Sequence, residues 1–101
     1  MVLDADPVRA RATARPGVEF YLGLRNYVAT LRRLGFDDAD LVAPGSDRFY
    51  DGVVAHGAAE AVVEQLIHHI TAGADHVALQ ILGDDSLPTL RALAPLLWEK
   101  P

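Results

Sequence analysis

The sequence predicts a small, mostly α-helical chain that contains one full β-strand. Over most of the chain, apolar residues recur at intervals of three and four, the spacing of an amphipathic helix. Residues 77–82 (VALQIL) instead form an apolar run, interrupted only by Gln80, of the kind found in parallel strands buried on both faces. Val2 and Leu3 form a two-residue remnant of a second strand.

Composition and charge limit the classes of function. The chain has 101 residues, 50% of them hydrophobic, with a mean hydropathy of +0.13, so we expect one domain with apolar surface left for a partner. A net charge of -5 opposes nucleic-acid binding. The sequence has no cysteines and no apolar stretch long enough to cross a membrane. It does not begin with the basic residues followed by apolar residues that are typical of a signal peptide. We therefore expect a cytoplasmic protein that binds neither nucleic acid nor membrane.

Capping residues predict the first two helical stretches. Asp6 as N-cap and Pro7 at the first helical position open a helix, and Pro16 with the following glycine should kink or interrupt it. A second apolar stripe predicts a continuous helix from Val18 to Leu34, and a glycine at 35 ends it. Asp37 or Asp38 then caps a short turn.

Three more helices are predicted after this turn. Ser46 caps a helix that runs toward Gly57, and residues 58–73 form a strongly amphipathic helix. Asp85 or Ser86 caps the last helix, residues 88–98, which is bent at proline 95. The strand at 77–82 has no full-length neighbour, and a lone strand cannot satisfy its backbone groups. Its neighbours must come from outside this chain or from a second copy.

The order of these segments resembles a known family. The stretches LDADPVRARATAR, YLGLRNYVATLRRLGF, GSDRFYDGVVAHG and AAEAVVEQLIHHITAGADHVALQIL are similar to the C-terminal end of luciferase-like monooxygenases, particularly the branch that uses the deazaflavin coenzyme F-420. The similarity covers roughly residues 2–98. Two positions depart from the family pattern: Pro16 interrupts a usually continuous segment, and Arg25 stands where the family often has a helix-starting proline.

The resemblance implies an α/β fold, a (β/α)₈ barrel of about 250 residues, of which residues 1–101 are one partial domain, the last quarter. Val2 and Leu3 are then the tail of strand seven, residues 7–72 a helical crossover, 77–82 strand eight and 88–98 the closing helix. The family uses F-420 or FMN, but most of its cofactor pocket lies in the absent portion. No position here matches a family catalytic residue, so we expect no cofactor to bind this chain alone.

Three polar residues are candidates for cofactor contact. Gln80 is the one polar residue of the apolar run, Asp84 follows the strand where a barrel places its active site, and Asp4 follows the strand-seven remnant. The alternative is structural, because aspartates in such loops cap helices and a buried glutamine can satisfy backbone groups.

The histidines and arginines favour structural roles. His68 and His69 are adjacent on a helix and point about 100° apart, so we expect an exposed pair and no metal site. His56 suits a helix C-terminus. The arginines at 9, 11 and 15 form an exposed stripe.

Two functional hypotheses follow. In the first, the chain is the C-terminal fragment of a luciferase-like flavin- or deazaflavin-dependent oxidoreductase, inactive alone, and its partner is the missing barrel portion. In the second, it is a stand-alone helical module that binds a second copy of itself or another protein.

Overall fold

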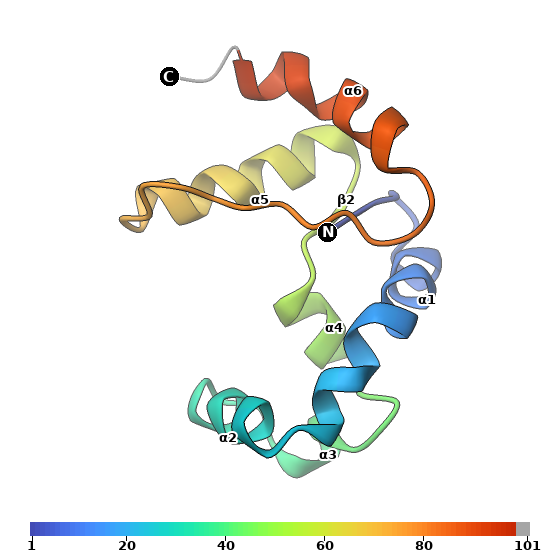
Figure 1. Ribbon diagram of the computed structural model, residues 1–101, viewed down its shortest axis with the longest axis vertical. Helices are drawn as coiled ribbons and strands as arrows, with labels where there is room; N and C mark the ends of the chain where they lie inside the picture. Colours follow the sequence, from blue (N-terminus) through green and yellow to red (C-terminus); the bar gives the residue numbers. More distant parts are fainter. Residues whose placement is uncertain (99–101) are drawn as a thin grey trace.

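The computed structural model describes residues 1–98, which form an elongated molecule with two halves (Figure 1). The helices α5 (Ala59–Thr71) and α6 (Ser86–Trp98) make the upper half, and the helices before them make the lower half. The molecule measures 40 × 30 × 18 Å, and its radius of gyration is 14.1 Å, whereas a compact chain of this length has about 13 Å. The prediction of a mostly helical chain is confirmed.

The first helix, α1 (Pro7–Val18), begins where the sequence predicts it. The Asp6 side chain accepts hydrogen bonds from the backbone N–H groups of Val8 and Arg9, at 3.0 and 3.3 Å. Of the two predicted outcomes at Pro16, a kink or an interruption, the interruption does not occur there, because α1 continues through this residue to Val18. A proline in the last turn removes only one helical hydrogen bond, and the chain then tightens into the 3₁₀ helix η1 (Glu19–Gly23).

The continuous helix predicted from Val18 to Leu34 is also wrong. The helix η1 ends at Gly23, Leu24 is extended (φ -107°, ψ 118°), and α2 (Arg25–Arg33) starts anew. Glycine is a poor helix former, which favours a break here. The predicted stop after α2 is confirmed, since Gly35 has a φ of 105°.

The next two helices are short and capped by side chains. Asp37 forms a reciprocal capping box with Asp40 at the start of α3 (Asp38–Leu41), and Ser46 accepts a hydrogen bond from the Phe49 N–H at the start of α4 (Asp47–Val53). Both predicted caps are confirmed.

The predicted end of α4 near Gly57 is wrong, because α4 stops at Val53 and His56–Gly57 form strand β2. This strand pairs in parallel with β1 (Val2–Leu3), and the Val2 N–H donates to the Ala55 carbonyl at 2.9 Å. Pairing with the N-terminal segment satisfies backbone groups that a longer α4 would leave at an exposed helix end.

The upper half is an α5–α6 pair. As predicted, α5 buries one apolar face, where Val62, Val63 and Leu66 pack around Leu93 of α6. The helix α6 begins at Ser86 and runs through proline 95. Ile70 belongs to the same predicted face of α5 but is 49% exposed, so this face is only partly covered.

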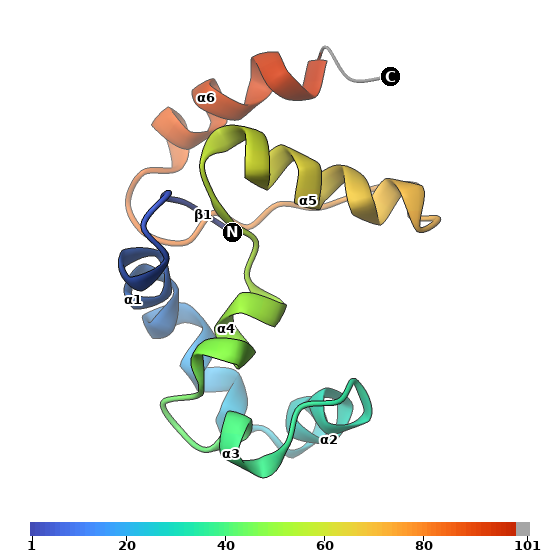
Figure 2. The same cartoon turned by 180° about the vertical axis from the view of Figure 1, so that it is seen from behind.

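The prediction of a full, buried strand at residues 77–82 is wrong. The segment is extended but is not part of the β1–β2 sheet, and none of its six side chains is buried. The Met1 amine donates to the Gln80 carbonyl at 2.6 Å, and the Leu82 N–H donates to the Met1 carbonyl at 3.0 Å. This is the bond pattern of parallel pairing between Met1 and Ile81. Figures 1 and 2 both show the segment crossing beside the N-terminus. A full strand does not form because pairing exists on one edge and over only a few residues.

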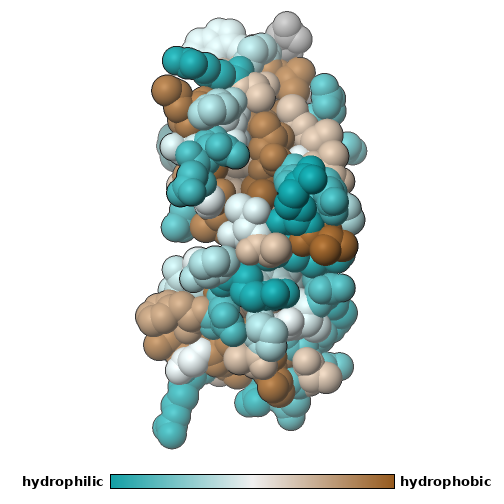
Figure 3. Space-filling view, turned by 90° about the vertical axis from the view of Figure 1, so that its right-hand side faces the viewer, coloured by the Kyte–Doolittle hydropathy of each residue, from teal (hydrophilic) through white to brown (hydrophobic). Residues whose placement is uncertain are grey.

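The chain exposes more surface than a compact monomer does. Its accessible surface is 6891 Å², roughly 1,300 Å² above the value of about 5,600 Å² expected for its mass. Large apolar side chains such as Leu34 and Trp98 are 72% and 90% exposed. Figure 3 shows apolar side chains among polar ones on one face, and a notch between the two halves.

Candidate functional site

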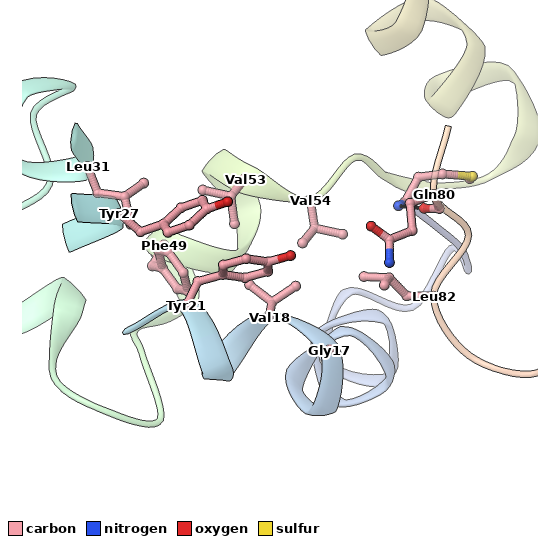
Figure 4. Close-up of a pocket in the computed structure, with 11 residues that line it drawn as sticks. Gly17, Val18, Tyr21, Tyr27, Leu31, Phe49, Val53, Val54, Gln80 and Leu82 are labelled. Atoms are coloured by element: carbon pink, nitrogen blue, oxygen red, sulfur yellow. Dashed lines mark hydrogen bonds between the residues drawn. The ribbon is translucent and has the colours of Figure 1, made fainter. Parts of the chain in front are cut away.

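An apolar pocket lies between the lower helices and the extended segment 77–82 (Figure 4). Its volume is about 290 Å³. We call it the tyrosine pocket. Its lining includes Tyr21, Tyr27, Phe49, Val54, Gln80 and Leu82.

Two tyrosines form one wall of the tyrosine pocket. The ring centroids of Tyr21 and Tyr27 lie 4.6 Å apart, with 50° between the ring planes. On a continuous helix, residues six positions apart point to different sides. The extended Leu24 turns the chain between η1 and α2 and brings the two rings into tilted contact. In Figure 4 both hydroxyl groups point toward the Gln80 end of the pocket.

The opposite end of the tyrosine pocket is formed by the extended segment. Gln80 and Leu82 line it together with Met1. The position of Gln80 follows from the hydrogen bond between its carbonyl and the Met1 amine. Burial removes water from this amine, which lowers its pKa.

The structure does not bring the three predicted contact residues together. Gln80 lines the pocket, whereas Asp4 and Asp84 do not. Asp4 accepts hydrogen bonds from Arg9 Nε and Nη2 at 2.6 and 2.8 Å, and these bonds lower the pKa of its carboxyl group. Asp84 is exposed in the loop before α6. For Asp4 the structural alternative therefore accounts for the residue.

A polar cluster that the sequence did not reveal connects α1, α4 and β2. Asp51 accepts two hydrogen bonds from Arg11, each 2.9 Å long, and its Oδ1 lies 2.8 Å from Nε2 of His56. The hydrogen bonds from Arg11 lower the pKa of Asp51 to about 2. Arg11 therefore binds a specific partner instead of forming an exposed stripe. His56 lies in β2 and not at the C-terminus of a helix.

The two adjacent histidines of α5 lie exposed, as the sequence predicts. His68 and His69 are both exposed on α5, where they border a cleft of about 550 Å³ beside Asp51 and Gln65. Within residues 1–98, no three histidine or carboxylate side chains are placed to hold a metal ion.

The tyrosine pocket supplies two phenol hydroxyls, one amide, the Met1 amine and apolar walls. Its lining has no carboxylate or imidazole, so no general acid or base of those kinds faces it. Its volume of about 290 Å³ is just below the range of roughly 300 to 1,000 Å³ typical of small-molecule sites.

Comparison of the chain with protein families, curated proteins and solved structures finds no match. Among the helices of residues 1–98, none has both the length and the apolar character needed to cross a bilayer.

Proposed function

We propose that the chain is the C-terminal portion of a luciferase-like oxidoreductase that uses coenzyme F-420 or FMN, and that it is inactive by itself. The observation that supports this is the parallel pairing of Met1 with Ile81. In a (β/α)₈ barrel, strands seven and eight are parallel neighbours joined by a helical crossover. Met1, just before β1, and the segment 77–82 also pair in parallel here, which supports the proposal.

The expected inactivity follows from the missing portion of the barrel, which in the family carries most of the cofactor pocket. The lining of the tyrosine pocket has no carboxylate or imidazole. Titration of the chain with FMN or F-420, followed by cofactor fluorescence, should give no saturable change. Saturable binding in the micromolar range would contradict this part of the proposal.

The origin of the chain is tested by the nucleic-acid sequence upstream of its first codon. We expect a continuation, in the same frame or displaced by a frameshift, that encodes the alternating strands and helices of strands one to seven. An upstream region without such coding capacity would contradict the family proposal. The result does not depend on how the isolated chain behaves in solution.

A second candidate function, self-association, is favoured by the surface area. A specific interface buries about 800 Å² on each partner. The chain exposes roughly 1,300 Å² more than a compact monomer of its mass, so it has enough surplus surface for one interface of this size.

A further inference from the structure

The extended segment 77–82 has one edge without backbone partners. In an extended chain, the N–H and C=O of one residue point to the same edge, and those of the next residue to the other. Since Gln80 and Leu82 bond to Met1, the backbone groups of Val77, Leu79 and Ile81 face the opposite edge. Within residues 1–98, these three residues make no backbone hydrogen bond. Such an edge is a template for another strand.

We propose that this edge binds the same edge of a second copy in antiparallel pairing, with the two-fold axis at Leu79. Leu79 then faces Leu79 of the second copy, and Val77 faces Ile81. Each of these pairs exchanges hydrogen bonds, because all three residues present their backbone groups to the open edge. The edge is self-complementary about its central residue, as an isologous two-fold interface requires.

The side chains also suit this pairing. Val77 and Leu79 pack on the α5–α6 face, where they border a groove of about 240 Å³ with Ile67, Ile70 and Leu97. Pairing about Leu79 continues this apolar face across the two copies. The same register places Asp75 opposite Gly83, so no like charges lie directly opposite each other.

This inference rests on the self-association candidate and specifies its interface, and it is independent of the family origin. A second copy is favoured as the occupant because the edge matches itself in register and the surplus surface suffices for one interface. A strand from a different polypeptide is the competing occupant, and it predicts that the chain alone is monomeric.

Sedimentation velocity tests association, and cysteine pairing tests the register. Ala78 and Gln80 are exposed, and the proposed register makes Ala78 of one copy the non-hydrogen-bonded neighbour of Gln80 of the other. Their Cβ atoms should lie about 4.5 to 5.5 Å apart, close enough for a disulfide after a small adjustment. The chain has no other cysteine, so the variants Ala78→Cys and Gln80→Cys each carry one thiol.

The two cysteine variants are oxidised with glutathione disulfide, separately and as an equimolar mixture. We expect a dimer in sedimentation, and a covalent dimer in the mixture at least about tenfold more abundant than in either variant alone. Identical positions lie about 7 to 8 Å apart on the diagonal, beyond the reach of an unstrained disulfide.

Three results would overturn the inference. A monomer at all concentrations excludes self-association altogether. A dimer without the mixed disulfide leaves self-association standing but excludes pairing through this edge. Efficient disulfide formation by Ala78→Cys alone indicates a different register. None of these results bears on the upstream coding sequence, which tests the family proposal separately.

Discussion

The two halves of the molecule differ in the kind of side chain that fills their cores. In the lower half, aromatic side chains are fully enclosed: Phe49 and Tyr50 are 1% and 0% exposed. In the upper half, the buried core consists of four aliphatic side chains, Val62, Val63, Leu66 and Leu93. Both halves leave other large apolar side chains exposed, such as Phe20 in the lower half and Trp98 in the upper half. The lower half therefore has an aromatic core and the upper half a smaller, aliphatic one.

Polar contacts reinforce this difference. The buried carboxylate of Asp40 in the lower half accepts hydrogen bonds from the Ser46 hydroxyl at 2.7 Å and from the Arg48 guanidinium. Tyr50 donates its hydroxyl hydrogen to the Pro44 carbonyl at 2.6 Å. No ion pair of residues 1–98 joins α5 to α6. The contact between α5 and α6 therefore depends on apolar packing.

The largest expected effect comes from removing a buried aromatic ring. Phe49→Ala should lower the free energy of unfolding by about 3 to 5 kcal/mol, because the ring is 1% exposed and its loss leaves a cavity. Phe20→Ala is the matched control, since Phe20 is 67% exposed and should change stability by less than about 0.5 kcal/mol. Urea unfolding followed by circular dichroism at one fixed protein concentration measures both variants. Equal losses in the two would contradict an aromatic core built around Phe49.

A smaller effect is expected in the aliphatic core. Leu93→Ala should cost about 2 kcal/mol, the low end for a buried leucine, because leucine leaves a smaller cavity than phenylalanine. Its control is Leu90→Ala on the same helix, where the side chain is 46% exposed. The same unfolding experiment compares them. A loss for Leu93→Ala as large as that for Phe49→Ala would remove the contrast between the halves.

The smallest effect depends on pH and concerns the Arg11–Asp51–His56 cluster. The folded-state pKa of Asp51 is about 2, below its ordinary value of 3.8, because Arg11 donates hydrogen bonds to the carboxylate. The stabilisation is therefore present above about pH 4 and is lost as pH falls toward 2. Because the Asp51 side chain is 42% exposed, solvent screening limits the effect to less than about 1 kcal/mol.

The variant Asp51→Asn isolates this contribution. Its melting temperature should lie below that of the unmodified chain at pH 6, and the two should converge as pH approaches 2. Thermal melts over this range check the prediction. A difference that stays constant from pH 6 to pH 2 would show that the charge of Asp51 has no part in it.

Local signals in the sequence predicted the helix starts and one helix stop. Asp6, Asp37 and Ser46 each place a side-chain oxygen beside unpaired N–H groups, a contact made within a few residues, and all three caps form. Gly35 ends its helix for a similarly local reason. The break at Leu24 was missed because the apolar stripe continues across it. The glycine at 23 was the available signal.

Contacts between residues far apart in the sequence could not be predicted from such local signals. The strand His56–Gly57 forms only because Val2–Leu3 lies beside it, and the partner of Asp51 is 40 positions away in the sequence. For the candidate site, the sequence indicated Gln80 but neither tyrosine, since Tyr21 and Tyr27 meet only after the chain turns at Leu24.

The sequence by itself determined where most helices begin, which face of α5 is buried, and that residues 77–82 would lack a full partner strand. These depend on contacts between near neighbours and on the apolar pattern of each segment. Only the tertiary structure decided that Met1 pairs with Ile81, which side chains fill each of the two cores, and which backbone edge is left free. These features depend on groups far apart in the sequence, and no local pattern records which of them meet.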